Sequence, residues 1–179
     1  MKPQTEDNIF DNQGFRFNVA ILLLNGSGDK AFWAKRIGAD SWQFPQGGLR
    51  AGESDLQSAY REIYEELGLE ADDVEVIGKT PSWFKYRLPV RFRRPRRQGH
   101  NQCVGQKQRW YLMRLNCSED KINLNATDEP EFERWTWHDY WQACQDVVHF
   151  KRKVYRQALD ELAFFFPHLL RSKSESNQL

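Results

Sequence analysis

The stretch from Gly47 to Leu69, GGLRAGESDLQSAYREIYEELGL, decides the fold, because it joins a glycine pair to a well-marked helix. Ser54 and Gln57 have the spacing of a capping box, in which the serine side chain caps the helix start and the glutamine side chain reaches back. Gly68 fits the position after the last turn. Between these ends, apolar residues recur every three or four positions and predict one buried stripe, formed by Leu56, Ala59, Tyr60, Ile63 and Leu67.

Three glutamates of this predicted helix, Glu62, Glu65 and Glu66, project from one side because they stand three and four positions apart. Like charges at this spacing destabilise an isolated helix by roughly a few tenths of a kcal/mol per pair, and a bound cation would offset the repulsion. Mg²⁺ suits such a site, since it prefers carboxylate oxygen and is normally shared with substrate phosphate. Glu53, near the positive end of the helix, can join the cluster. The alternative is a solvated acidic face, on which Arg61 pairs with Glu65.

The surrounding sequence favours the metal site. Gly47 is followed after five residues by Glu53 and after seven more by the run REIYEELGL at 61–69, and this spacing resembles the Nudix box at every defined position. The resemblance implies an α/β (α+β) fold, a mixed β-sheet sandwiched between helices, in which the box forms a loop–helix–loop and the pair Gly47-Gly48 bends the loop toward a metal. It also implies hydrolysis of a nucleoside diphosphate linked to another moiety, with Mg²⁺ or Mn²⁺ held by Glu62, Glu65 and Glu66.

Outside the box, the chain resembles the bacterial RNA 5′-pyrophosphohydrolases, also described as dinucleoside polyphosphate hydrolases, over nearly its whole length. The segments that carry this resemblance are FRFNV at 15–19, SWQFPQGG at 41–48, GQKQRW at 105–110, PEF at 130–132 and VHFKR at 148–152. It implies that Glu131 is a further metal ligand or a carboxylate that positions water. By the same resemblance, the substrate phosphates would contact Arg16, Arg36 and Lys107, and a nucleotide near the 5′ end would be held by Ser41, Tyr86, Phe150 and Lys151.

Some of these roles have alternatives in the sequence itself. Phe150 would stack on a base by the resemblance, but it also fits the apolar face of the last predicted helix. Glu131 lies in the acidic turn 128–131, where an exposed glutamate needs no function. The general base is assigned to Glu66 or Glu62, which lie nearest the apolar stripe and form the less solvated pair.

The function implied is that of an RNA 5′-pyrophosphohydrolase, which converts triphosphate or diphosphate ends to 5′-monophosphates and so promotes mRNA decay. The first alternative is a hydrolase of dinucleoside polyphosphates such as diadenosine tetraphosphate or pentaphosphate, which would use the same metal site. The second is a non-catalytic RNA-binding Nudix module, which is disfavoured because every box carboxylate is present. RNA 5′ ends or dinucleoside polyphosphates are therefore the expected partners of a chain expected to be monomeric, and a protein activator is unknown.

The charge of the chain is balanced overall but unevenly distributed. Its 179 residues carry a formal net charge of +1, yet the interval between Glu75 and Glu119 holds eleven Lys and Arg and no Asp or Glu. Such a basic stretch suits a polyanion. The loop Arg91–Gln102 is a candidate contact for RNA further from the 5′ end or for a partner protein, and the alternative is a solvated basic loop with no partner.

The length predicts one domain, from 14 to 170, between a flexible tail at 1–13 and a disordered tail at 171–179. Three separated cysteines fit neither a disulfide framework nor a zinc site and indicate a reducing compartment. No signal peptide or membrane-spanning segment is visible, so a cytoplasmic protein is expected. The remaining predicted elements are strands at Phe15–Asn25, Lys30–Arg36, Val74–Ser82 and Gln108–Leu115, a short helix at His138–Cys144 and a longer helix from about Val147.

Overall fold

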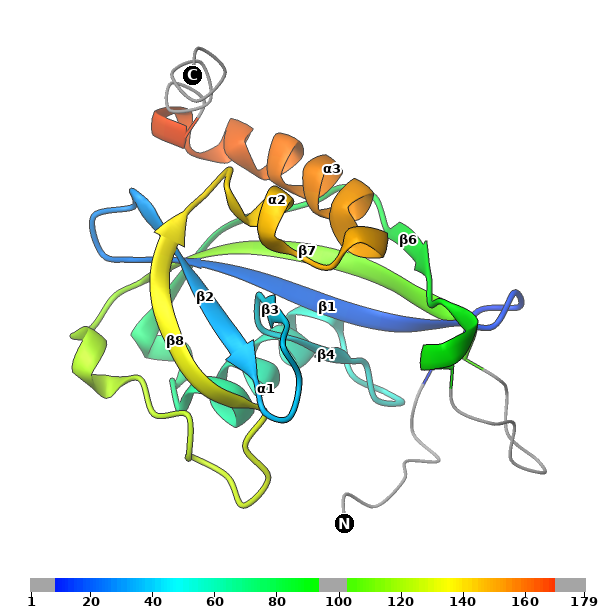
Figure 1. The fold of residues 1–179 in the computed structure, drawn as a ribbon. Helices are drawn as coiled ribbons and strands as arrows, with labels where there is room; N and C mark the ends of the chain where they lie inside the picture. Colours follow the sequence, from blue (N-terminus) through cyan, green and yellow to red (C-terminus); the bar gives the residue numbers. More distant parts are fainter. Residues whose placement is uncertain (1–8, 94–102, 170–179) are drawn as a thin grey trace.

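The computed structural model describes residues 9–93 and 103–169 of the chain. It confirms a mixed α/β fold in which one mixed sheet lies between helices (Figure 1). The sheet has the strand order β3-β2-β1-β7-β5, with β4 paired to β1, β6 to β7 and β8 to β2. The predicted tail at 171–179, residues 1–8 of the N-terminal tail and residues 94–102 of the basic loop lie outside the described residues.

The elements are β1 (Phe15–Leu24), β2 (Lys30–Arg36), β3 (Trp42–Gln43), β4 (Gln46–Gly48), α1 (Asp55–Leu67), β5 (Val74–Lys79), β6 (Phe84–Arg87), β7 (Gly105–Leu115), β8 (Phe132–Asp139), α2 (Ala143–Asp146) and α3 (Arg152–Leu162).

Strand β1 runs through the middle of the sheet because its apolar run is buried on both faces. Its odd-numbered residues from Val19 to Leu23 pack with α1, and its even-numbered residues from Ala20 to Leu24 pack with α3. A strand with two buried faces needs no alternation of polar and apolar residues, which is why this stretch is continuously apolar. β1 pairs with β7 in parallel along its whole length.

Helix α1 has the ends that the sequence predicts. The Ser54 hydroxyl accepts from the N–H of Gln57 at 3.2 Å, and the Gln57 side chain accepts from the N–H of Ser54 at 2.9 Å. Gly68 takes a left-handed φ of 68°, and its N–H donates to the carbonyl of Tyr64. The buried apolar stripe is shorter than predicted, because Leu56 at its N-terminal end is exposed. These caps fix which side of the helix is buried, and therefore where its glutamates point.

The sheet opens next to α1. Strands β1 and β2 separate after the pair Leu24–Ala31, and the short strands β3 and β4 occupy the space between them (Figure 1). β4 pairs with β1 from Asn18–Gly48 to Ala20–Gln46. Helix α1 follows seven residues later and packs on β1 and β4. The opening of the sheet thus brings the box helix, β4 and the ends of β2 and β8 together.

The C-terminal part of the chain differs from the sequence prediction in two places. β8 extends to Asp139, where a helix from His138 was predicted, and α2 begins later and is short. The signal for this strand is the alternation of Trp135 and Trp137, which pack on the α1-side core, with the exposed Thr136. The longer helix was predicted from Val147, but α3 begins five residues later, because Val147 has an extended backbone and His149–Lys151 form a 3-10 turn.

The basic interval between Glu75 and Glu119 contains an unpredicted strand. In β6, Phe84 and Tyr86 alternate with Lys85 and Arg87, a period of two that the concentration of basic residues obscured. β7 starts at Gly105, three residues earlier than predicted, because its pairing with β6 continues to that residue. β5 ends three residues before its predicted boundary.

None of the helices in the described part of the chain has the length and apolar composition needed to cross a bilayer.

Candidate active site

Arg61 of α1 ties the glycine-rich segment to the helix. Its guanidinium donates to the two carboxylate oxygens of Glu53 at 2.7 and 2.9 Å and to the carbonyl of Gly48 at 2.9 Å. It also contacts the carboxylates of Glu62 and, at 3.3 Å, Glu65. Although burial opposes the shift, these bonds lower the pKa of Glu53. Arg61 therefore joins Glu53 to Glu62 and Glu65 in one network of ion pairs, which the sequence alone did not indicate.

Three carboxylates from two distant segments meet at the opening of the sheet. Glu62 and Glu66 come from α1 and are 6% and 3% exposed, and Glu131 comes from the segment before β8. The carbonyl of Glu131 accepts from the N–H of Ile37, which holds this segment against the end of β2. Burial raises the pKa of Glu66 well above its ordinary range, and the charges of Glu62 and Glu131 raise it further. Burial also raises the pKa of Glu62, although Arg61 opposes the shift. A cation would relieve both effects.

Glu65 stands on the outer side of this group. Its carboxylate accepts from Arg50 at 2.9 Å and from Arg61 at 3.3 Å. In residues 9–93 and 103–169, no three His, Cys, Asp or Glu side chains already have the spacing of a metal site. Arg61 contacts both Glu62 and Glu65 in this arrangement, and the role of these two carboxylates as metal ligands stays a prediction.

The donor set at Glu66 fits a hard divalent cation. Its Oε2 accepts from the N–H of Gln46 at 3.1 Å, whereas its Oε1 is buried and has no hydrogen-bond partner in the described part of the chain. A buried carboxylate oxygen without a partner is unfavourable. Mg²⁺ and Mn²⁺ both prefer oxygen ligands, so the residues present match the requirements of such an ion.

Gly47 and Gly48 allow close approach to β4 and do not bend the chain as expected. Both lie in β4, and neither has a positive φ. A Cβ on Gly47 would lie 1.8 Å from Cδ of Glu62, and a Cβ on Gly48 would lie 2.1 Å from Nη2 of Arg16. The missing side chains therefore let a carboxylate and a guanidinium lie directly against this strand.

Gln46 links the carboxylates to a group of substrate-binding candidates. Besides its backbone bond to Glu66, its side-chain oxygen accepts from the ammonium of Lys151 at 3.4 Å. Lys151 is 7% exposed and also donates to Gln43 at 3.0 Å. Burial lowers the pKa of Lys151 to about 7, the charge of Arg36 lowers it further, and Glu66 opposes the shift. A phosphate beside this amine would stabilise its charged form.

The rings predicted to hold a nucleotide lie beside Lys151. Its ammonium is 5.7 Å from the ring centroid of Tyr86, which lies 6.0 Å from that of Phe150. The Tyr86 hydroxyl donates to Gln106 at 2.8 Å. Phe150 is half-buried in the 3-10 turn before α3 and packs partly against the α3-side core. The packing interpretation of Phe150 is therefore confirmed in part, and its stacking on a base stays a prediction.

Ser41 and Lys107 are placed differently from each other. Ser41 precedes β3, and its carbonyl accepts from the N–H of Arg36 at 3.0 Å, so it lies at the opening of the sheet. The Lys107 ammonium lies 4.7 Å from the ring centroid of Phe17 and 3.7 Å from the carboxylate of Asp11. On β7, Lys107 is next to Gln108, which donates to Gln46 beside Lys151. Neighbouring residues of a strand face opposite sides of the sheet, so Lys107 lies on the other face from Gln108. Its contact with phosphate stays a prediction.

Sequence reasoning missed the amide side chains that connect the carboxylates to Lys151 and the rings beside it. Gln43 and Gln108 are 4% and 0% exposed, and Gln108 donates to Gln46 at 3.2 Å and to Asn18 at 2.8 Å. Glutamine is rarely buried unless it is hydrogen-bonded, so glutamines next to buried aromatic residues in strands were the available signal.

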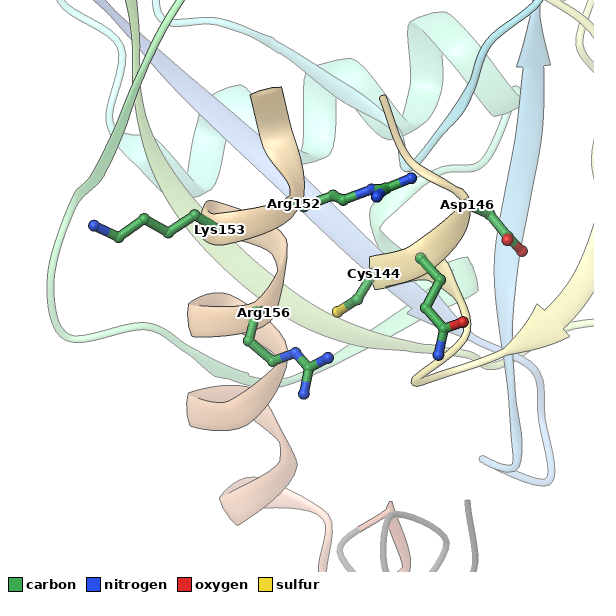
Figure 2. Close-up of a pocket in the computed structure, with 6 residues that line it drawn as sticks. Cys144, Asp146, Arg152, Lys153 and Arg156 are labelled. Atoms are coloured by element: carbon green, nitrogen blue, oxygen red, sulfur yellow. The ribbon is translucent and has the colours of Figure 1, made fainter. Parts of the chain in front are cut away.

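A separate cavity of about 650 Å³ lies between α2 and the first turns of α3 (Figure 2). Its one acidic residue, Asp146, is paired with His138 at 2.7 Å. None of the predicted site residues lines it, so it is distinct from the candidate active site. Its lining residues are Cys144, Gln145, Asp146, Arg152, Lys153 and Arg156.

The fold and the carboxylate cluster together define a hydrolase of the Nudix class, and comparison with known proteins agrees. The NUDIX domain family matches residues 14–158, and the chain belongs to this family. It is accordingly a pyrophosphohydrolase, and enzymes of this family generally act with divalent metal ions.

Three known proteins illustrate the similarity. An RNA pyrophosphohydrolase of Francisella philomiragia is 53% identical over 154 residues, which cover 84% of this chain and 95% of that protein. One of Methylococcus capsulatus is 50% identical over 154 residues, covering 86% and 79%. The crystal structure of an Ap4A hydrolase from C. elegans has a TM-score of 0.57 at 16% identity and covers 87% of this chain and 98% of that one. This last similarity concerns the fold alone.

Proposed function

We propose that this enzyme converts the 5′-triphosphate or 5′-diphosphate end of RNA to a 5′-monophosphate in the cytoplasm, and so promotes mRNA decay. Mg²⁺ is the proposed ion, and Mn²⁺ can replace it. The relatives named RNA pyrophosphohydrolase, half identical over most of the chain, support this substrate. The structural observation that carries the proposal is the junction at Gln46, which places a buried lysine beside a cluster of buried carboxylates. A polyphosphate attached to a nucleotide could use both groups, the carboxylates through a bound cation and the lysine directly.

The proposed division of roles follows from the position of each group. Divalent ions held by the carboxylates would supply charge that neutralises the phosphate oxygens and lowers the pKa of water. The ligands of the ion are proposed to be Glu62, Glu65, Glu66 and Glu131. One carboxylate of the pair Glu62 and Glu66 takes a proton from water, whose oxygen bonds to phosphorus as the anhydride P–O bond breaks. The leaving pyrophosphate or phosphate keeps the electron pair of that bond. Substrate phosphates are held by Arg16, Arg36, Lys107 and Lys151, and the adjoining nucleotide by Ser41, Tyr86 and Phe150.

The alternative substrate is a dinucleoside polyphosphate, because the same carboxylates would serve its hydrolysis. The Ap4A hydrolase from C. elegans shares the fold at low identity, which lends this alternative less support than the RNA pyrophosphohydrolases lend the first. The basic interval between Glu75 and Glu119 also favours the longer polyanion, since phosphates beyond the reacting group need further cations.

A comparison of the two substrates tests the proposal. The purified protein is given 5′-triphosphorylated RNA and diadenosine tetraphosphate separately, at equal concentration and fixed salt, with Mg²⁺ or with excess chelator. We expect RNA to be converted with the larger kcat/KM and both reactions to stop with the chelator. Rapid cleavage of diadenosine tetraphosphate with intact RNA ends would reject the RNA assignment, and hydrolysis of neither compound with Mg²⁺ or Mn²⁺ would favour a non-catalytic module.

A further inference from the structure

Three aromatic rings form a row that leads from the candidate active site to the surface. Tyr86 at the inner end is 6% exposed, and its ring centroid lies 6.0 Å from that of Phe150. The next centroid, that of Phe92, lies 5.8 Å further on, and this ring is 52% exposed. Both pairs of rings are tilted by 39°, and about half of the Phe92 surface remains exposed.

Phe92 has no role in the core that would explain a phenylalanine at this position. It lies in the 3-10 turn Val90–Phe92 and belongs to neither of the two core clusters. Val90 in the same turn is 77% exposed. Exposed apolar residues that stand alone are common in proteins, but this ring continues a row that begins in the candidate active site.

Three arginines of β6 and the 3-10 turn after it form no ion pair with a carboxylate in the described part of the chain. The guanidinium of Arg91 lies over the Phe92 ring, 4.9 Å from its centroid. Arg87 contacts another aromatic ring, and Arg93 donates to a backbone carbonyl. Among the described residues, none of these three arginines forms an ion pair with Asp or Glu, whereas lysines of the same basic interval do. An aromatic ring beside an uncompensated cation is the arrangement with which proteins bind single-stranded nucleic acid.

We propose that Arg91 and Phe92, the outer stacking site, bind an RNA nucleotide downstream of the one held beside Tyr86 and Lys151. The ring stacks on its base and the guanidinium binds its phosphate. This inference rests on the proposed function, because it needs an RNA chain that continues from the reacting end. Stacking on phenylalanine requires no particular base, so the outer site favours longer RNA whatever its sequence.

The direction of the row distinguishes RNA from a dinucleoside polyphosphate. The successive contacts run from Glu66 through Gln46 and Lys151 to the three rings, so the nucleotide site lies between the carboxylates and the outer stacking site in this series. An RNA chain extends in this direction from its first nucleotide. The second nucleoside of a dinucleoside polyphosphate is attached through the polyphosphate and would lie beyond the carboxylates instead.

The test measures KM and kcat on 5′-triphosphorylated RNAs that lengthen from one to six nucleotides. We expect the KM of the unaltered enzyme to fall with length and then level off. Phe92→Ala should raise KM on the longer RNAs by about tenfold, while KM for the single nucleotide and for diadenosine tetraphosphate changes by less than about twofold. Phe92→Tyr should retain the low KM. The matched control is Phe164→Ala, since this ring is 73% exposed in the turn after α3 and lies outside the row.

A fluorescence measurement locates the stacked base. 2-Aminopurine is placed at each position of a six-nucleotide RNA bound to the Glu66→Gln enzyme, and stacking quenches its emission. Quenching at one downstream position that Phe92→Ala abolishes would support the outer stacking site. If RNA is converted but Phe92→Ala leaves KM unchanged at every length, the outer stacking site is refuted and the proposed function stands. If RNA of no length is converted, the proposed function fails and the outer site with it.

Discussion

Glu66→Gln is expected to lower the rate of pyrophosphate hydrolysis by about 10³-fold or more and, at the same time, to stabilise the metal-free protein. The rate falls because an amide neither accepts a proton nor binds Mg²⁺ as a carboxylate does. The fold is retained because the amide oxygen of the variant can still accept from the N–H of Gln46. Stability rises because a buried negative charge, close to the charges of Glu62 and Glu131, is removed. The measurements are kcat with Mg²⁺ and thermal unfolding with chelator.

The gain in stability depends on pH in a direction that the raised pKa of Glu66 determines. The ordinary pKa of this carboxyl is 4.5, and burial together with the charges of Glu62 and Glu131 raises it in the folded protein. Such a group contributes stability that is fully present below pH 4.5 and is lost as the pH rises through the folded pKa. The advantage of Glu66→Gln should therefore be absent at low pH and should reach roughly 3 °C or more in Tm near neutral pH.

Glu75→Gln is the matched control, because its carboxylate is exposed on β5 and pairs with Arg114. It should change neither the rate nor the dependence of Tm on pH. If the Glu66→Gln enzyme keeps a tenth of its activity, this carboxylate is not catalytic. If the variant is less stable than the unaltered protein without metal at neutral pH, the buried charge of Glu66 does not destabilise the fold.

Gly47→Ala is the second change for which a large effect is expected, although it adds a single methyl group. The new Cβ would lie 1.8 Å from Cδ of Glu62, and the backbone cannot retreat because Gly47 pairs with Val19 of β1. The carboxylate must therefore leave its place. Since displaced metal ligands and misplaced reacting groups each reduce activity, we expect kcat to fall by about 10²-fold or more. Steady-state kinetics with titrated Mg²⁺ measures this loss.

Gly26→Ala provides the control for Gly47→Ala. A Cβ at Gly26 would meet only the carbonyl of Leu115, at 3.8 Å, and this glycine has no positive φ. Its activity should match that of the unaltered enzyme. Gly48→Ala, which displaces the Arg16 guanidinium, should raise KM for the polyphosphate more than it lowers kcat. Normal kcat in Gly47→Ala would mean that the position of Glu62 does not matter for the reaction.

The local part of the fold could be predicted from the sequence because local interactions determine it. Helix α1 carries its start and stop signals within its own sequence, from Ser54 to Gly68, and the structure has both caps. β1 and β2 were equally clear, since a long apolar run and a turn need no distant information. In the same way, the spacing along one helix was enough to place the carboxylates of Glu62 and Glu66 on its buried side.

The features that the sequence did not reveal depend on contacts between distant segments. Glu131 reaches the carboxylates only because β8 pairs with β2, and no strand was predicted before the helix expected from His138. The ion pair between Glu53 and Arg61 forms only because the segment after β4 folds back onto α1. Burial of Lys151 depends on Gln43 and Gln46 arriving from the opposite side of the sheet opening. No spacing within a single element carries such information.

The central claim is that the carboxylates of Glu62, Glu66 and Glu131 hold a divalent ion against a polyphosphate. Its most direct test is the anomalous diffraction of a crystal soaked with Mn²⁺ and a non-hydrolysable nucleoside triphosphate. We predict a Mn²⁺ peak about 2.1 Å from oxygens of Glu66 and Glu62 and of the phosphates, with Arg61 withdrawn from Glu62. A triphosphate bound with its metal elsewhere, while Arg61 still holds Glu62 and the Glu66 carboxylate has no ion beside it, would contradict the claim.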